Sequence, residues 1–276
     1  MRTINCKGKL IDLSSPKIMG ILNITPDSFF DGGKYRNKKS ILKQVNKMLT
    51  EGATFIDVGA YSSRPGAEHI TEKEELNRIL PIVNLLIDTF PKILISIDTF
   101  RSEVANQCIT AGAAMINDIS GGDADKNMFA TAVALQVPYI IMHMQGTPQN
   151  MQDNPCYKDV LQEVAFDLAN KSAKLKKMGL NDFIIDLGFG FGKTIADNYM
   201  LLNNLDRFQL LDCPILTGIS RKSMLYKPLN IDANMSLNAT TFANTIALQR
   251  GSHILRVHDI KEANEIITLH SLLSNS

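Results

Sequence analysis

The amino-acid sequence predicts a single (β/α)8 barrel, a TIM barrel of the α/β class, preceded by a short N-terminal cap. Eight short apolar runs rich in β-branched residues alternate with longer stretches of helical periodicity, as expected of buried parallel strands joined by helices. In addition, polar side chains stand at the end of nearly every apolar run. An open doubly wound sheet is the alternative that shares the first of these two observations.

The apolar runs give the order of the strands along the chain. The predicted strands are Lys17–Leu22, Thr54–Val58, Ile93–Asp98, Ala114–Asp118, Pro138–His143, Asp182–Leu187, Pro214–Gly218 and His253–Val257. Residues 1–16 precede the first strand, and we expect them to form a cap that closes the bottom of the barrel. The barrel domain is therefore predicted to span residues 17–276, a length that suits one large domain.

The stretches between the strands carry helix signals. Thr71 and Glu74 have the spacing of a capping box, and Gly179 stands where a helix C-terminus favours glycine. The predicted helices are Ser40–Thr50, Thr71–Phe90, Arg101–Thr110, Asn127–Leu135, Asp159–Met178, Asn198–Leu205, Leu237–Gln249 and Lys261–Leu273. Each follows one predicted strand, so the pattern favours the barrel.

Composition and charge exclude several functional classes. The net charge of +1 gives no electrostatic footprint for nucleic acid or for a membrane surface. No apolar run reaches about 18 residues, so we predict no transmembrane span, and the N-terminus has no core of a signal peptide. The four cysteines are far apart and form no CxxC pair, which fits a cytoplasmic protein without disulfides.

Polar residues at the strand ends predict a binding site. In a barrel of this type, the carboxyl ends of the strands surround the active site. The residues at these ends are Asn23, Asp57, Asp98, Asn117, Asp118, His143, Asp186, Arg256 and His258. A barrel with only a structural role has no need of such a ring, although Asp118 also suits helix capping.

Two loops near the N-terminus suggest contacts with a ligand. The loop "NITPDSFFDGG" begins at Asn23 and contains Asp27, and its adjacent phenylalanines favour a mobile cover over an inert surface turn. The loop "GAYSSRPGA" supplies Ser63 and Arg64, which suit phosphate, although an exposed loop with a chance arginine is an equal alternative. We expect residues Ile24–Tyr35 and Ala60–Ile70 to be mobile until substrates bind.

The glycine-rich stretch "IIDLGFGFGKT" is neither a P-loop nor a dinucleotide fingerprint, because its glycine spacing fits neither pattern. We interpret its glycines as allowing close approach to a flat ligand beside Phe189 or Phe191, with Asp186 as the strongest ligand candidate.

The last two strands suggest an anion site. In "GISRKSM", Lys222 is predicted to act as a hydrogen-bond donor or charge partner rather than as a Schiff-base lysine. In "LRVHD", Arg256 and His258 alternate along a strand and are expected to bind one anion together, unless they are a surface arginine and a capping histidine.

Seven of these motifs together resemble the dihydropteroate synthase family of folate biosynthesis. They run from Met19 to Asp259, in order: "LNITPDSFFDGG", "SSRPGA", "SIDT", "INDISGG", "DLGFGFGK", "SRKSM" and "RVHD". The resemblance implies a transferase that joins 6-hydroxymethyl-7,8-dihydropterin diphosphate to 4-aminobenzoate, releasing pyrophosphate and 7,8-dihydropteroate. It also implies a homodimer, a magnesium requirement and a sulfonamide target.

The resemblance assigns roles to individual residues. Those implied to hold the pterin are Asp98, Asn117, Asp186 and Lys222. Those implied to contact the diphosphate are Ser63, Arg256 and His258, with Asn23 as a ligand of Mg²⁺. Val257 is also implied to bind substrate. Those implied to surround aminobenzoate are Arg64, Pro65, Phe191 and Ser223. The implied catalytic set is Asn23, Asp27, Ser63, Arg64, Lys222, Arg256 and His258.

Three positions depart from the family pattern. Ser63 stands where threonine is frequent, while Tyr61 and Leu187 stand where an acidic residue and a proline are expected. Two alternatives share the pterin-binding features, namely a pterin-binding methyltransferase domain and a non-catalytic pterin-binding protein. The first would not need the diphosphate motifs, and the second should have lost Asn23, Lys222 or Arg256. We expect a dissociative substitution without a covalent intermediate.

Overall fold

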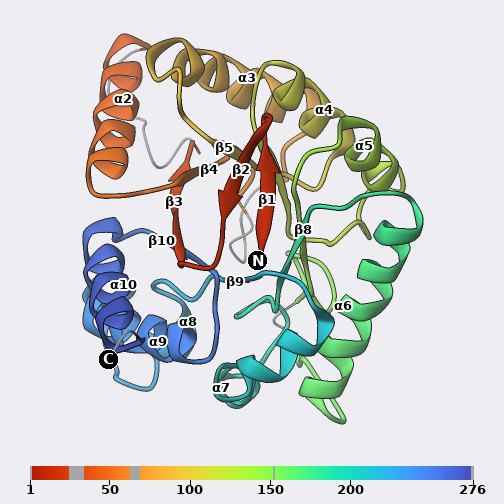
Figure 1. Cartoon of the computed structure of the whole chain (residues 1–276), viewed down its shortest axis with the longest axis vertical. Helices are drawn as coiled ribbons and strands as arrows, with labels where there is room; N and C mark the ends of the chain where they lie inside the picture. Colours follow the sequence, from red (N-terminus) through yellow and green to blue (C-terminus); the bar gives the residue numbers. More distant parts are fainter. Residues whose placement is uncertain (1, 25–33, 63–68, 152, 275–276) are drawn as a thin grey trace.

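The computed structural model describes residues 2–24, 34–62, 69–151 and 153–274, and it contains a closed parallel barrel. The strand order around the barrel is β10-β3-β4-β5-β6-β7-β8-β9, and the helices surround it (Figure 1). The strands are β3 (Lys17–Asn23), β4 (Phe55–Gly59), β5 (Ile95–Asp98), β6 (Met115–Asp118), β7 (Tyr139–Met142), β8 (Phe183–Asp186), β9 (Ile215–Thr217) and β10 (Ile254–Val257). The predicted (β/α)8 barrel is confirmed, and the open sheet is excluded because β10 pairs with both β9 and β3.

Helices follow the strands along the described chain. They are α2 (Lys34–Thr50), α3 (Glu72–Thr89), α4 (Ser102–Thr110), α5 (Met128–Leu135), α6 (Val160–Lys177), α7 (Ile195–Asn203), α8 (Ser223–Tyr226), α9 (Leu237–Gln249) and α10 (Ile260–Ser274). Two 3₁₀ turns, η1 (Leu205–Leu211) and η2 (Ala233–Met235), and the short α8 are additions that the sequence pattern did not predict.

Capping side chains explain where several helices begin. The side chain of Thr71 accepts a hydrogen bond from the backbone of Glu74 at 3.2 Å, as its spacing predicts. The predicted start of α7 at Asn198 is wrong, because Thr194 and Asp197 form a capping box that starts this helix three residues earlier. Gly179 has a φ of +90° just after α6, which confirms its predicted place at the helix end.

The strand register aligns the carboxyl ends that carry the polar residues. Asn23 pairs with Gly59, Gly59 pairs with Asp98, and Asp98 pairs with Asn117. The ends of β3 to β6 therefore lie at one level around the barrel. Because consecutive strands are parallel, side chains that are far apart in the sequence converge at this end.

The opposite end of the barrel is covered by an antiparallel hairpin of β1 (Thr3–Cys6) and β2 (Lys9–Asp12) (Figure 1). Its buried residues Ile4, Cys6, Ile11 and Leu13 pack against residues that open several barrel strands. These barrel residues are Met19, Phe55, Ala114, Met115, Ile140, Ile184, Leu216 and Ile254. The division of the chain into a cap of residues 1–16 and a barrel domain of residues 17–276 stays a prediction.

The hairpin allows a matched test of this packing. Ile4 is 1% exposed, whereas Leu10 on the partner strand is 69% exposed. We expect Ile4→Ala to lower the free energy of unfolding by about 2–5 kcal/mol, because it leaves a cavity beneath the barrel. Leu10→Ala should change it by less than about 0.5 kcal/mol. Urea unfolding followed by circular dichroism measures both, and equal losses would contradict the described packing.

Candidate active site

Arg256 on β10 reaches across the mouth of the barrel to two carboxylates. Its Nε donates to Asp57 Oδ2 at 2.6 Å, and its Nη2 donates to Asp98 Oδ2 at 2.6 Å. Asn117 Nδ2 donates to the same Asp57 oxygen at 3.0 Å. One connected network therefore joins the ends of β4, β5, β6 and β10.

The charges in this network shift one another. Burial would lower the pKa of Arg256, but Asp57 and Asp98 together raise it above its usual value. Burial raises the pKa of Asp98 to about 7, against the opposing effect of Arg256. Burial thus favours the neutral form of Asp98, while the ion pair with Arg256 favours the carboxylate.

Asp57 belongs to the strand-end residues of the predicted binding site, but the sequence analysis assigned it no individual role. It is 1% exposed, and its Oδ1 is buried without a hydrogen-bond partner among the described residues. A buried acceptor without a partner is costly unless a water or a ligand supplies a donor. The signal for Asp57 was its place in the strand "FIDVG", whose end lies level with that of β5.

Asp186 and Lys222 form the second charged group of the mouth. Asp186 ends β8, is 6% exposed, and accepts a hydrogen bond on Oδ1 from the backbone of Gly188 at 2.8 Å. Lys222 Nζ donates to the carbonyl of Phe189 and lies 4.6 Å from the centre of the Phe191 ring. Burial lowers the pKa of Lys222 to about 8, while Asp186 favours its charged form; burial raises the pKa of Asp186.

Two glycines after β8 approach the backbone that follows β7. Gly188 has a φ of +68°, and a side chain there would meet the carbonyl oxygen of His143 at 1.9 Å. Gly192 has a φ of +59°, and a side chain there would meet the carbonyl oxygen of Gln145 at 2.5 Å. These two glycines let the loop pack against the chain that follows β7. The interpretation that the glycine-rich stretch also allows close approach to a flat ligand stays a prediction.

Lys193 fixes the loop after β8 through hydrogen bonds to its backbone carbonyls, a role that the sequence analysis missed. It is 4% exposed, and its Nζ lies 2.9 Å from His143 Nδ1, 3.0 Å from the carbonyl of Gly188 and 3.1 Å from that of Phe191. Burial lowers the pKa of Lys193 to about 7, and these acceptors stabilise its protonated form. Burial, assisted by Lys193, lowers the pKa of His143 to about 3, so His143 stays neutral.

His258 and Arg256 have different partners in the described contacts. The imidazole Nδ1 of His258 lies 3.0 Å from Ser220 Oγ, whereas Arg256 turns toward Asp57 and Asp98. Their binding of one anion therefore stays a prediction. Val257 between them is fully buried, so its side chain belongs to the core.

The remaining predicted residues fall into two groups. Asn23, Phe191 and Ser223 are half-buried at the end of β3, in the loop after β8 and at the start of α8, respectively. Four predicted site residues lie outside the described residues, as do most of the two loops predicted to be mobile. These four are Asp27, Ser63, Arg64 and Pro65.

The departure at Leu187 has a structural explanation. Its side chain is fully buried in the core between barrel and helices, directly after Asp186. The turn that follows is made by Gly188, whose positive φ provides the change of direction without a proline.

Comparisons with known proteins show the family of this chain. The family model described as pterin binding enzyme matches residues 19–258. The chain belongs to this family. The alignment with dihydropteroate synthase of Haemophilus influenzae has 41% identity over 270 residues and covers 97% of this chain and 98% of that relative.

Solved structures of the pterin binding family share the fold over the whole chain. A Yersinia pestis dihydropteroate synthase with a sulfonamide drug has a TM-score of 0.93 at 37% identity, with 100% of both chains covered. A Xanthomonas albilineans dihydropteroate synthase in complex with 7,8-dihydropteroate has a TM-score of 0.89 at 32% identity, also with 100% of both chains covered. In this family member, none of the described helices is long and apolar enough to cross a membrane.

The burial of Lys222 and the nearby charge of Asp186 predict a lysine with a lowered pKa. In protein with ¹³C-labelled lysines, we expect one lysine that titrates with a midpoint near 8 and is lost in Lys222→Met. Asp186→Asn should move this midpoint lower, because it removes the negative charge that favours the ammonium form. The exposed Asp88→Asn on α3 serves as the control and should leave the midpoint unchanged. An NMR titration that shows a higher midpoint in Asp186→Asn would disprove the pairing.

Proposed function

We propose that this chain catalyses the dihydropteroate synthase reaction, the condensation of 6-hydroxymethyl-7,8-dihydropterin diphosphate with 4-aminobenzoate. The products are 7,8-dihydropteroate and pyrophosphate. The observation that carries the proposal is the set of buried polar groups at one end of the barrel of a pterin binding family member. Relatives that match the chain over nearly its full length are dihydropteroate synthases, which supports the same conclusion.

The buried groups suit the edge of a pterin ring, which carries an amino group, ring N–H groups and a carbonyl. Asp186 offers carboxylate oxygens to neighbouring N–H donors, as a carboxylate does to a guanidinium. Asn117 already uses its amide N–H toward Asp57, so its amide oxygen remains to accept from the ring. Lys222 supplies a donor for the ring carbonyl.

The diphosphate is the part of the substrate that leaves with growing negative charge. Arg256 and His258 stand at the end of β10 and in the chain after it, and we assign them to this charge. Arg256 would then change partner from the carboxylates to the diphosphate, or hold both. Because the pterin fragment becomes a conjugated cation and the aromatic amine is already a free nucleophile, a dissociative path needs no covalent intermediate and no strong general base.

A magnesium ion fits the residues around the diphosphate only as a weakly held ion. Within the described ranges, no three His, Cys, Asp or Glu side chains are grouped to hold a metal. Asn23 supplies one half-buried amide oxygen at the end of β3, which suits Mg²⁺ that takes its other ligands from water and diphosphate. When bound, the ion would neutralise the charge that develops on the leaving diphosphate.

We also propose a homodimer, formed through α9 and α10. The two helices lie side by side (Figure 1). Their large apolar side chains are exposed: Phe242 is 65% exposed, Leu269 60%, Leu272 65% and Leu273 72%. Such a group of exposed apolar residues is typical of a protein interface. A cytoplasmic location is supported by the four cysteines, none of which forms a disulfide.

The activity is tested by pyrophosphate release from the pterin diphosphate with and without 4-aminobenzoate. We expect release that depends on aminobenzoate and equals the dihydropteroate formed. Asp186→Asn should weaken pterin binding by about 1–3 kcal/mol, because an amide presents a donor to the ring N–H groups. Asp88→Asn, on the exposed face of α3, should bind and react as the unmodified protein does.

Two outcomes would contradict the proposed activity. Pterin binding without pyrophosphate release would indicate a methyltransferase-type domain or a non-catalytic pterin-binding protein. Unchanged pterin affinity in Asp186→Asn by calorimetric titration would remove Asp186 from the site.

The dimer is tested by sedimentation velocity. Phe242→Glu places a charge in the proposed interface and should weaken dimerisation by about 2 kcal/mol or more, roughly 30-fold in Kd. Phe166→Glu on α6 is the matched control, because Phe166 is 71% exposed and α6 lies on the other side of the barrel from α9 and α10 (Figure 1). A monomer in the unmodified protein, or equal effects of the two variants, would contradict the proposed interface.

A further inference from the structure

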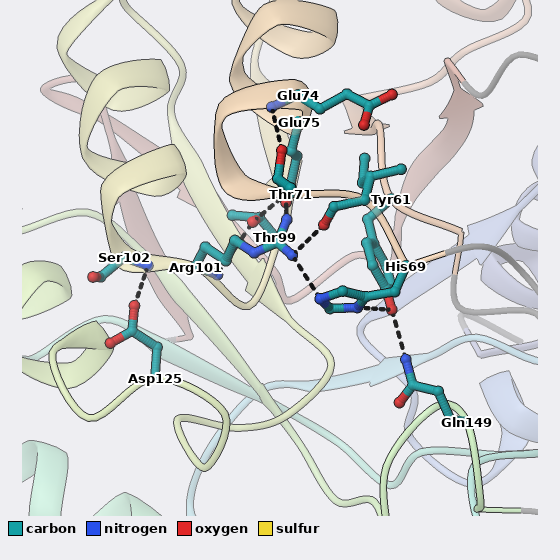
Figure 2. Close-up of polar contacts among 11 residues, drawn as sticks. Tyr61, His69, Thr71, Glu74, Glu75, Thr99, Arg101, Ser102, Asp125 and Gln149 are labelled. Atoms are coloured by element: carbon teal, nitrogen blue, oxygen red, sulfur yellow. Dashed lines mark hydrogen bonds and ion pairs between the residues drawn. The ribbon is translucent and has the colours of Figure 1, made fainter.

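Tyr61, where the sequence departs from the family pattern, lies at the centre of a group of contacts above the barrel strands. It follows β4, at the start of the connection to α3. Figure 2 shows its hydroxyl between His69 Nδ1, at 3.1 Å, and Gln149 Nε2, at 2.8 Å. Its ring packs edge-on against Phe100, with ring centres 4.9 Å apart.

Arg101 holds both ends of the connection between β4 and α3. Its Nη2 donates to the carbonyl of Ile70 at 2.6 Å, near the end of the connection. Its guanidinium carbon lies 5.6 Å from the centre of the Tyr61 ring, at the start, and 5.0 Å from that of Phe100. The two ends are thereby brought together over one cation.

Arg101 itself is fixed by a buried partner. Its Nη1 forms an ion pair with Glu75 of α3, whose side chain is fully buried (Figure 2). Thr99 Oγ1 donates to the other oxygen of Glu75 at 2.7 Å. Although burial raises the pKa of Glu75, these hydrogen bonds favour its charged form. Breaking a buried pair leaves an uncompensated charge, so Arg101 has little freedom to move.

The direction of the hydrogen bonds follows from the donors present. Arg101 has only donors, and its Nη2 lies 3.5 Å from His69 Nε2, so this ring nitrogen accepts. The proton of a neutral His69 is then on Nδ1 and points to the Tyr61 oxygen. Gln149 Nε2 also donates to this oxygen, which therefore accepts two hydrogen bonds. A phenylalanine cannot replace this acceptor.

The contact with Gln149 joins two loops that come from different sides of the pterin site. Tyr61 follows β4, and Gln149 belongs to the loop after β7. Between these strands lie β5 and β6, whose ends carry Asp98 and Asn117. The bridge thus links the loops on either side of two proposed pterin ligands, without contacting those ligands in the described set of hydrogen bonds.

We propose that Tyr61 is a positioning residue whose hydroxyl fastens the loop after β7 to the connection between β4 and α3. Arg101, Glu75 and His69 hold Tyr61 in place, and Gln149 is its partner across the mouth. The bridge joins two outer loops and makes no described hydrogen bond to the proposed pterin ligands Asp98 and Asn117, which lie deeper. By fixing these loops, the bridge shapes the entrance through which the second substrate, the aromatic amine, reaches the site. Only this kinetic consequence rests on the proposed function.

The first experiment needs no substrate and measures hydrogen–deuterium exchange in Tyr61→Phe and Gln149→Ala. We expect each variant to speed exchange at both sites, in peptides containing His69 and Ile70 and in peptides containing Gln149, because each removes the same bridge. Gln107→Ala is the matched control, since its amide donates to Glu103 within α4 at 2.7 Å. Faster exchange only around the substituted residue would overturn the proposal.

The second experiment measures steady-state kinetics of the same variants and of the double variant. We expect the KM for 4-aminobenzoate to rise about three- to tenfold in each single variant, as for one lost hydrogen bond, with little change in kcat. The affinity for the pterin diphosphate should not change. The double variant should be no worse than the single ones, because both remove one interaction.

The two experiments separate this proposal from the proposed function. If the unmodified chain does not release pyrophosphate, the proposed function fails, and the exchange experiment still decides whether the bridge exists. If exchange changes reciprocally but the effects on KM multiply in the double variant, or fall on the pterin affinity, the positioning role for the amine is wrong.

Discussion

The candidate site depends on one interaction, the contact of Arg256 with Asp57 and Asp98 inside the mouth of the barrel. Two carboxylates at this depth would repel each other and lose hydration, and a single guanidinium stabilises both. The same contact orients Asn117 through its bond to Asp57. The network is therefore preorganised for a ligand rich in N–H donors, before any such ligand binds.

A second cation acts on the backbone instead of on carboxylates. Lys193 binds carbonyl oxygens of the loop after β8 and the ring of His143 from the end of β7. These bonds fix the loop that carries Phe189 and Phe191. The carbonyl of Phe189 accepts a hydrogen bond from Lys222, and the ring of Phe191 lies against the same ammonium group. The position of Lys222 beside Asp186 thus depends on Lys193 and on glycines that allow the loop to approach β7.

Three cations with low exposure therefore organise three parts of this barrel. Arg256 organises the strand ends, Lys193 organises the loop after β8, and Arg101 organises the connection between β4 and α3. Each lies among several acceptors, so its burial is compensated. Such fixed groups need little reorganisation when charge develops during a reaction.

The sequence by itself determined the barrel, the strand-end residues and the family. Short apolar runs and helical periodicity are local properties, and the barrel rules convert them into one topology in which Asp98, Asn117 and Asp186 must lie at the same end. The start of α7 was misplaced, because the capping box of Thr194 with Asp197 precedes the apolar part of that helix.

Only the tertiary structure decided which of these residues touch one another. Arg256 meets Asp57 across the barrel, Lys193 meets His143, and Tyr61 meets Gln149. Each pair joins segments that are 50 or more residues apart, at 199, 50 and 88 residues respectively. Sequence patterns report the period and the caps of single elements, whereas such contacts depend on strand register and side-chain direction, which are fixed only when the barrel closes.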